Sequence, residues 1–585
     1  MARLANFLAL WEPRPDVRSR LERDVRSSGE FDGVSQPEHG WLTASGGVGE
    51  KAGEAARGDP SLLFAEGMAL FGGERSAGGD AWAKLAFDVD HRPSSLGRRR
   101  GDFTFVRLRP LGGATLVRSC GGLAPLYFCT TRESVAIATR LDYFARYLLD
   151  EPRLDGLVLG AWLTGALVFP DGRAFLRGVS CVPRGGFVEI RADGRARAGS
   201  YWDPRAGTLG ARTRAAAEER ALRLRSVLVD TLDRDLDPRG GNLLAWSGGV
   251  DSTALACLGS GTLGRPLSSL TLLPTRPDDL RHELPYLRSI DGRFQFERSW
   301  EVPLDAVRAL EARRDAPPLV FPPVLLPCCL LPGIQRDARI RVLVGGDLAD
   351  ETCGSLRRVR DWLDQRSWTH LWSAPRRWPA GLRTPRSWLS TRARRWFGVL
   401  TDNAPVAWPW LRPGVIAEFD DWRRSRLVAA ARDPRPNRWL ALLLADDAWL
   451  AEAWEAATAL GVRPSYPFAT REALELAFEC PAEELIGPGT KLILRRALRS
   501  DLPPLHLVRP DKGAWTPWTG ERLGHLVHLT HDDEQAGAIV DLDSLRKAMV
   551  SFGFLDALRI TMLTNIVRGV RARAHARAAA RASTG

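Results

Sequence analysis

The chain has 585 residues, which is long enough for more than one domain. A hydrophobic content of 44% and a charged content of 26% are typical of a globular protein with a large core. No run of about 18 or more uncharged apolar residues occurs, so the sequence predicts no membrane-spanning helix.

The charge and the cysteines narrow the class of protein further. The net charge of +12 is carried almost entirely by arginine, which fits either a bias toward arginine codons or affinity for an acidic partner. No nucleic-acid recognition module is visible, so nucleic-acid binding is not expected. The 8 cysteines form no C-x-x-C pair and the N-terminus has no secretory signal, so we expect a cytoplasmic protein with free thiols.

Residues 1–205 contain the short apolar runs, bounded by glycine and charge, that are typical of strands, for example at 103–106, 114–117 and 134–138. The runs at 101–105, 124–128 and 137–139 resemble the second half of a class II glutamine amidotransferase (Ntn-type) domain. The pieces at 179–186 and 201–204 resemble the exit from that domain in asparagine synthetases. This resemblance predicts a β-rich domain over 1–205 and a second domain over 206–585.

One position departs from the glutaminase pattern. Active members of that family expose their cysteine as the first residue after removal of Met1, where the free α-amine serves as the base. Here residue 2 is Ala2, and Cys120 is the first cysteine. The resemblance therefore implies a glutaminase-like fold without glutaminase activity.

The second domain is expected to open with a helix at 213–233, followed by a nucleotide-binding strand, loop and helix at 243–258. Glycines in the loop allow a sharp turn and leave backbone N–H groups open to an anion, and Asp251 beside that anion suggests a bridging Mg²⁺ ion. The pattern is not a P-loop; it resembles the pyrophosphate loop of ATP-pyrophosphatases, which adenylate a carboxylate. The predicted ATP-binding residues of this loop are Ser247, Gly248, Gly249, Asp251, Ser252 and Thr253.

Two later segments extend the predicted ATP site. The run 267–273 is a predicted parallel strand, and the resemblance places Thr271 and Leu272 beside the adenine. The segment 282–286 resembles the D-E-x-x-Y element that opens the next helix of the family. The run 342–344 precedes a segment that resembles the G-E-G-A-D-E motif of asparagine synthetases and contains Gly345, Gly346, Asp347, Asp350 and Glu351.

The resemblance assigns roles to these acidic residues. Asp251 and Asp350 fall on the two magnesium ligands of the family, at the carboxyl ends of strands where open α/β sheets bind ligands. Asp347 falls where asparagine synthetases have Glu, and we predict it as the base that takes a proton from the attacking amine. Glu351 is a further predicted catalytic residue, and Gly345 and Gly346 are predicted to contact the nucleotide.

Residues 355–415 form an insertion rich in Arg and Trp. Arginine pairs with carboxylates and stacks on tryptophan. The insertion is either an arginine-coated helical unit with its own small core or a surface for an extended peptide substrate.

Two lysines complete the predicted site. The segments 491–495 and 509–513 resemble the K-x-x-L-R and R-x-K-x-G-F motifs of asparagine synthetases. Lys512 matches the family lysine that stabilises charge developing during acyl transfer. Lys491 is either a second phosphate contact or a charge on a helix surface.

Together these motifs make the chain resemble an asparagine synthetase, an enzyme that uses Mg²⁺ and ATP to form an amide and releases AMP and pyrophosphate. Without a glutaminase cysteine, the amine must come from elsewhere. The interpretation we favour is the macrolactam-forming cyclase of lasso peptide biosynthesis, which joins the N-terminal amine of a precursor peptide to an Asp or Glu side chain. Its expected partners are a leader peptidase and a leader-binding recognition protein. A β-lactam synthetase, an ammonia-dependent asparagine synthetase and a non-catalytic nucleotide-binding scaffold remain as alternatives.

Overall fold

The computed structural model describes residues 6–28, 31, 33–35, 41–46, 62–71, 74–76, 96, 100–121, 124–149, 151–163, 169–204, 209–274, 277–303, 339–355, 358–365, 410–445, 449–486, 489–509 and 537–548. Ala2, Lys512 and positions 366–409 of the Arg- and Trp-rich insertion lie outside the described residues.

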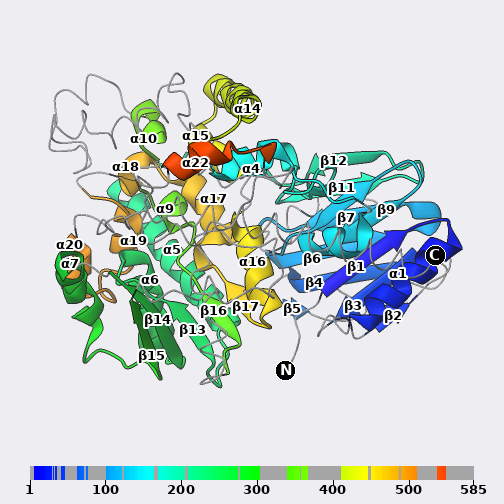
Figure 1. Cartoon of the computed structure of the whole chain (residues 1–585). Coiled ribbons are helices and arrows are strands. Elements are labelled where there is room, and N and C mark those ends of the chain that lie inside the picture. The colour runs from blue at the N-terminus through cyan, green and yellow to red at the C-terminus, as the bar shows by residue number, and fades with distance from the viewer. Residues whose placement is uncertain are drawn as a thin grey trace.

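The N-terminal part forms a sandwich of two antiparallel sheets, at the right of Figure 1. In the described residues one sheet has the strand order β10-β8-β9-β1-β3-β2 and the other β12-β11-β7-β6-β4-β5. The strands are β1 (Asn6–Trp11), β2 (Gly33–Ser35), β3 (Trp41–Gly46), β4 (Leu62–Phe71), β5 (Glu74–Ser76), β6 (Arg100–Leu108), β7 (Ala114–Arg118), β8 (Tyr127–Thr130), β9 (Val135–Ala138), β10 (Ser180–Cys181), β11 (Gly186–Ile190) and β12 (Ala196–Ser200).

Strand β1 is apolar at consecutive positions because both of its faces are covered. Phe7 and Ala9 pack into the core between the two sheets, with residues of β6, β7 and β11. Leu8 and Leu10 point to the opposite face and pack against Leu21 of helix α1 (Pro15–Ser27). Because side chains alternate between the two faces of a strand, residues of β1 pack into two different cores.

The C-terminal part is built on a parallel sheet with the order β15-β14-β13-β16-β17. Its strands are β13 (Asn242–Ala245), β14 (Leu267–Leu273), β15 (Ser299–Pro303), β16 (Val342–Val344) and β17 (Arg463–Ser465). From β13 the chain passes to β14 and β15 on one side and then to β16 on the other. The carboxyl ends of β13 and β16 are thus neighbours at the point where the strand order reverses, which is where open α/β sheets bind ligands.

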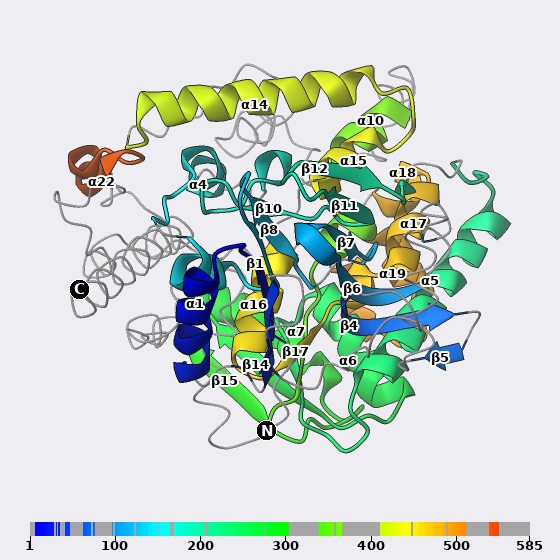
Figure 2. The ribbon, with the colours of Figure 1, turned by 90° about the vertical axis from the view of Figure 1, so that its right-hand side faces the viewer.

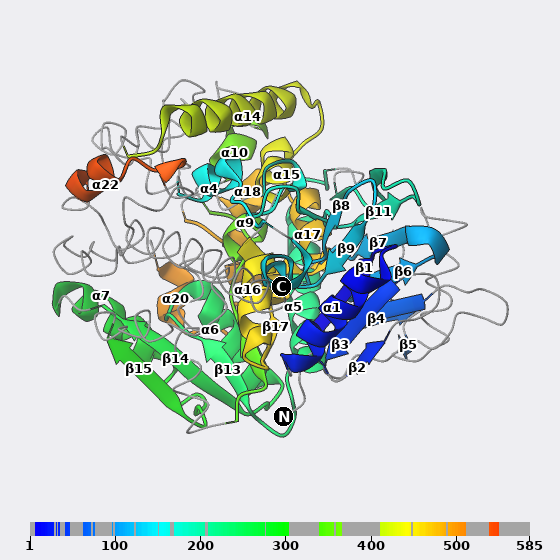
Figure 3. The same cartoon turned by 45° about the vertical axis from the view of Figure 1, so that its right-hand side comes forward.

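Helices pack around this sheet (Figure 3). They include α5 (Arg214–Asp235), α6 (Val250–Ala256), α7 (Pro277–Leu287), α9 (Ala349–Thr352), α15 (Arg438–Ala445), α16 (Trp449–Ala459), α17 (Arg471–Glu479), α19 (Leu492–Ala497) and α20 (Pro504–Val508). The hydroxyl of Thr213 caps α5 by accepting a hydrogen bond from Ala216 N at 3.2 Å. The expected α/β class, with a β-rich part before a parallel sheet, is confirmed.

One expected helix boundary was wrong. The 282–286 element was expected to open its helix, but α7 begins at Pro277, so Glu283 and Tyr286 lie in its second half. Pro277 sits in the first turn with Asp278 and Asp279, the arrangement that starts a helix because proline lacks the N–H that would be unsatisfied there.

A long helix, α14 (Pro413–Arg432), lies along the outer edge of the molecule and crosses the top of Figure 2. It packs on α4 (Gly156–Leu163) of the N-terminal part. A Cβ on Gly160 would meet Val415 Cγ1 at 2.6 Å, so glycine permits the close approach of the two helices. Among the helices of the described residues, none has both the length and the apolar character needed to cross a membrane.

Candidate active site

The predicted pyrophosphate loop follows β13, the central strand of the parallel sheet. Gly248 adopts a φ of +66°, in the left-handed region, and a Cβ there would meet a side chain of α7 at 2.9 Å. The Ser252 hydroxyl accepts from Ser247 N at 3.2 Å and donates to Gly249 O at 3.3 Å. The loop is therefore folded back on itself, with Ser247 exposed and Ser252 buried.

Three charged side chains meet beside this loop. The ammonium Nζ of Lys491 contacts Oδ2 of Asp251 and lies 2.8 Å from Oδ1 of Asp350. Burial alone would lower the pKa of Lys491, but the two carboxylates outweigh burial and raise it, so the side chain stays protonated. Lys491 is thus a buried cation between two carboxylates rather than a charge on a helix surface.

The backbone fixes this lysine in place. Lys491 precedes α19 with a φ of +58°, an uncommon conformation for a residue with a side chain. Its N–H donates to Gly354 O at 2.8 Å, just after α9, the helix that carries Asp350. The same segment of backbone therefore orients both the lysine and one of its two carboxylate partners.

The two carboxylates also suit a divalent cation. Asp251 Oδ1 is buried and has no hydrogen-bond partner in the described part of the chain. An unpartnered buried carboxylate oxygen is costly unless a ligand or a cation completes it. Oxygen ligands from two carboxylates, with the remaining positions left to phosphate and water, are what Mg²⁺ prefers. Asp251 and Asp350 therefore fit the magnesium role that the sequence assigned to them.

The loop after β16 lies directly against the pyrophosphate loop. A Cβ on Gly346 would sit 3.1 Å from Asp251 Cβ. A Cβ on Gly345 would meet Asp347 Oδ2 at 2.4 Å and Tyr466 Cε1 at 2.6 Å. The two glycines thus let the loops approach closely, and they make the Asp347 carboxylate a neighbour of the Tyr466 ring.

Beneath the loop lies a network whose importance the sequence did not reveal. The carbonyl of Gly248 accepts hydrogen bonds from His506 Nε2 at 2.9 Å and from Arg509 Nη1 at 3.0 Å. Arg509 Nη2 also binds both oxygens of Glu283, at 2.9 and 3.0 Å, and its guanidinium stacks 3.8 Å from the centre of the Tyr286 ring. This network holds the left-handed turn from its inner side.

The state of His506 follows from its surroundings. Burial lowers its pKa, and the nearby arginines lower it further, so the imidazole is neutral near pH 7. A carbonyl oxygen can only accept, so the proton lies on Nε2, which faces Gly248 O. Nε2 also lies 3.1 Å from the Thr253 hydroxyl, which links the network to the start of α6.

The other predicted residues occupy the same edge of the sheet or its surroundings. Thr271 is buried near the carboxyl end of β14, one residue beyond the pairing of Leu270 with Ala245, and Leu272 follows it half-buried. Glu351 is buried directly after Asp350 in α9. The role of Lys512 stays a prediction, because that residue lies outside the described ranges.

Comparison with known proteins identifies the family. A family model described as asparagine synthase matches residues 223–555, which include the parallel sheet and all of the site described above. The chain belongs to the asparagine synthase family. As a member of that family it is an ATP-dependent, amide-bond-forming ligase. No curated protein matches the chain.

Two solved structures show a distant likeness to this asparagine synthase family member. Glutamine phosphoribosylpyrophosphate amidotransferase from B. subtilis, complexed with ADP and GMP, is 10% identical, with 51% of this chain and 81% of that chain covered and a TM-score of 0.22. An allosteric regulatory enzyme of purine biosynthesis is also 10% identical, with 54% and 82% covered and a TM-score of 0.22.

The start of the Arg- and Trp-rich insertion belongs to the core of this family member. Arg358 is fully buried, with Nη2 at 2.9 Å from Asn437 Oδ1 and Nε at 3.3 Å from Asp361 Oδ2. Trp362 is also fully buried. Arg360 stacks 4.3 Å from the ring centre of Trp439. In this described part, arginine and tryptophan serve packing.

Proposed function

We propose that this ligase is a macrolactam-forming cyclase of the lasso peptide type. It would adenylate an Asp or Glu side chain of a precursor peptide at the expense of ATP, with release of pyrophosphate. The N-terminal amine of the same peptide would then attack the acyl group, and AMP would leave. The products are a cyclic amide, AMP and pyrophosphate.

The state of the cysteines in the β-rich part carries this proposal. Residues 1–205 contain Cys120, Cys129 and Cys181. Cys120 and Cys181 are buried, burial raises the pKa of Cys120 to about 12, and burial also raises the pKa of Cys129. A nucleophilic thiol needs a lowered pKa and access to its substrate, so none of the three is suited to release ammonia from glutamine. An amine that arrives as part of the substrate removes the need for such a thiol.

The residues of the site fit the two chemical steps. The loop at 247–253, at the carboxyl edge of the sheet, would receive the phosphates, and Asp251 and Asp350 would hold Mg²⁺. The ion, when bound, would supply positive charge beside the phosphates. Lys491, a fixed cation at the same place, would help to stabilise the negative charge that develops on the phosphates. Asp347, beside the ring of Tyr466, would accept the proton that the amine loses on attack.

The proposed partners follow from the proposed substrate. The N-terminal amine of the core peptide is free only after a leader segment has been removed. A leader peptidase and a leader-binding recognition protein would therefore act before this enzyme. Both are part of the proposal.

Release of AMP and pyrophosphate with a panel of acceptors tests the proposal. The panel contains a linear peptide with a free N-terminus and an internal acidic residue, the same peptide with an acetylated N-terminus, and aspartate with ammonia. AMP formed only with the free peptide, with loss of the mass of one water from that peptide, would support the cyclase. AMP formed with aspartate and ammonia would replace it by an ammonia-dependent asparagine synthetase.

Two variants control the measurement. Asp251→Asn removes one predicted magnesium ligand without changing its size and should abolish AMP release. Asp193→Asn makes the same exchange on a half-exposed carboxylate between β11 and β12, remote from the sheet edge, and should leave AMP release unchanged. Nucleotide binding without AMP release in the unmodified enzyme, for every acceptor, would favour a scaffold.

A further inference from the structure

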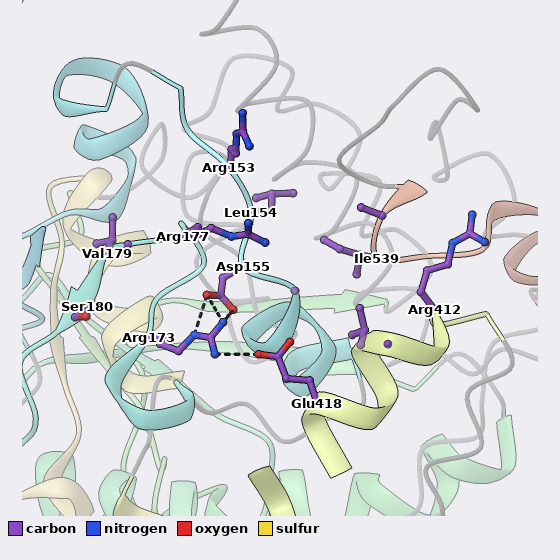
Figure 4. A pocket seen from close by; sticks show the side chains of 15 residues that line it. Arg153, Leu154, Asp155, Arg173, Arg177, Val179, Ser180, Arg412, Glu418 and Ile539 are labelled. Carbon is purple, nitrogen blue, oxygen red and sulfur yellow. Dashed lines mark hydrogen bonds and ion pairs between the residues drawn. The ribbon is translucent and has the colours of Figure 1, made fainter. Parts of the chain in front are cut away.

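A cavity apart from the candidate active site lies where the two parts of the chain meet, at the beginnings of α4 and α14 (Figure 4). Its volume is about 750 Å³. The lining comes from both sides of the boundary, with segments near 153–156 and 173–180 from the N-terminal part and segments near 412–418 and 538–539 from the C-terminal part. None of the lining residues belongs to the candidate active site. We refer to this cavity as the arginine pocket.

One arginine of the pocket has a structural role. Arg173 makes a bidentate pair with Asp155, with Nε at 2.9 Å from Oδ2 and Nη2 at 2.9 Å from Oδ1, and its Nη1 lies 3.0 Å from Glu418 Oε1. Asp155 is also tied to the backbone of α4, because its Oδ1 accepts from Val158 N at 3.2 Å. These contacts join α4 to α14 and pair one guanidinium with both carboxylates that line the pocket.

Three other arginines line the pocket at its surface. Arg153, Arg177 and Arg412 are exposed, come from three different segments, and are seen around the open middle of the pocket in Figure 4. Of these, Arg412 pairs with the partly exposed carboxylate of Asp541 at 3.6 Å and donates to Gly537 O at 2.8 Å. The guanidinium of Arg177 has no ion pair in the described ranges. Arg153 pairs with Glu151, but both side chains are largely exposed, and exposed ion pairs are weak. Four lining arginines against two carboxylates leave the pocket with a net positive charge.

The backbone adds to the positive potential. α14 begins here, with 20 residues and no side-chain cap on its first N–H groups. Gly414, in its first turn, lines the pocket, and a Cβ at that position would meet nothing within 4 Å. The positive end of the helix dipole is therefore open toward the cavity. Aliphatic side chains complete the walls: Leu154, Val179, Val415 and Ile539.

We propose that the arginine pocket binds an acidic peptide segment in which carboxylates are interspersed with aliphatic side chains. The cavity has the size of a site for a ligand of several residues, not for a single anion. Arginines spread over three segments match several separate carboxylates, and the aliphatic walls match side chains between them. The inference deepens the proposed function, on which it rests for the source of the peptide, by giving the substrate a contact away from the site of adenylation.

Fluorescence anisotropy of the full-length protein tests this inference. The probe is a labelled peptide of sequence Glu-Leu-Asp-Leu-Glu, acetylated and amidated so that it cannot be cyclised, and its neutral match is Gln-Leu-Asn-Leu-Gln. Arg177→Glu reverses the charge of the unpaired arginine. Arg195→Glu makes the same change on an arginine that is 83% exposed between β11 and β12, and therefore controls for net charge. Binding is measured at about 0.1 M salt, with and without Mg²⁺–ATP.

We expect the acidic probe to bind at least about tenfold more tightly than its neutral match. Arg177→Glu should weaken binding by about tenfold or more, Arg195→Glu by less than about twofold, and Mg²⁺–ATP should not compete. Equal losses in the two variants, no loss in Arg177→Glu, competition by Mg²⁺–ATP, or displacement by inorganic phosphate alone would each overturn the inference. Because the probe cannot react, binding can succeed even if the cyclase proposal fails, and cyclisation can succeed even if binding fails.

Discussion

A buried carboxyl at the contact of the two halves gives the sharpest stability prediction. Glu455, on α16, is fully buried, and its Oε2 accepts a hydrogen bond from Leu141 N of the N-terminal part at 3.1 Å. Its carboxyl also forms a hydrogen bond with Tyr127, which lowers its pKa and partly offsets the effect of burial. Arg140, a cation that interacts with Glu455, already makes a bidentate pair with Asp142, at 2.9 and 3.0 Å. Glu455 is therefore a second carboxyl beside a neutralised pair.

Burial, with a smaller contribution from Asp142, raises the pKa of Glu455 from 4.5 to about 8. The folded state keeps this proton up to about pH 8, whereas the unfolded chain loses it near pH 4.5. Between these values the folded state binds more protons, so stability falls as pH rises. At pH 7 the loss is about 3 kcal/mol, from roughly 1.4 kcal/mol for each of the 2.5 pH units above the unfolded pKa.

The variant Glu455→Gln removes the titration and keeps an oxygen for Leu141 N. We expect it to be more stable than the parent by about 3 kcal/mol at pH 7, and equal to it near pH 4.5. Urea unfolding followed by tryptophan fluorescence at several pH values measures the difference. Glu455→Ala, which leaves Leu141 N without its acceptor, should instead destabilise by about 1–3 kcal/mol at every pH. A Glu455→Gln variant that is less stable at pH 8, or a difference that does not change with pH, would show that Glu455 is ionised in the fold and would refute the reasoning.

Three further predictions concern the candidate active site. Lys491→Met removes the cation between the two carboxylates and should lower the rate of pyrophosphate release by about 10²–10³; a rate within about twofold of the parent would contradict its role. Because burial lowers the pKa of His506, the parent should lose stability as pH falls below about 6.5. The variant His506→Gln, which keeps a donor for the loop carbonyl, should not lose stability in this way. Urea unfolding of both proteins, above and below about pH 6.5, shows whether the loss depends on this residue. Arg509→Lys and Glu283→Gln should be strongly non-additive in a double-mutant cycle, with a coupling of about 1–3 kcal/mol, and additive effects would show that the buried pair does not act as a unit.

Local signals were sufficient to predict much of the framework. The apolar runs before Ser247 and before Gly345 are strands β13 and β16, because a buried parallel strand has to be apolar on both faces. The position of acidic residues after each strand, together with the resemblance to asparagine synthetases, predicted that Asp251 and Asp350 lie at the same edge of one sheet, and the structure places them there. The predicted helix after position 213 is α5, with Thr213 as its cap.

The contacts that complete the site could not be predicted in this way. Lys491 is 240 residues from Asp251, and Arg509 is 261 residues from the Gly248 carbonyl that it binds. A lysine before a helix has the same local sequence signal whether it faces solvent or two carboxylates. Only the tertiary fold, which buries Lys491 to 7% exposure, distinguishes these cases.

The segment 491–509 supports both the predicted pyrophosphate loop and the two carboxylates that contact Lys491. Arg495 of α19, four residues after Lys491, donates from Nη1 to His506 O and from Nη2 to Arg509 O at 2.8 Å. His506 and Arg509 in turn hold the carbonyl of Gly248. The lysine between the carboxylates and the two residues under the loop are therefore parts of one hydrogen-bonded unit that spans 491–509. A change at Arg495 should therefore disturb both the loop at 247–253 and the Asp251–Lys491–Asp350 cluster.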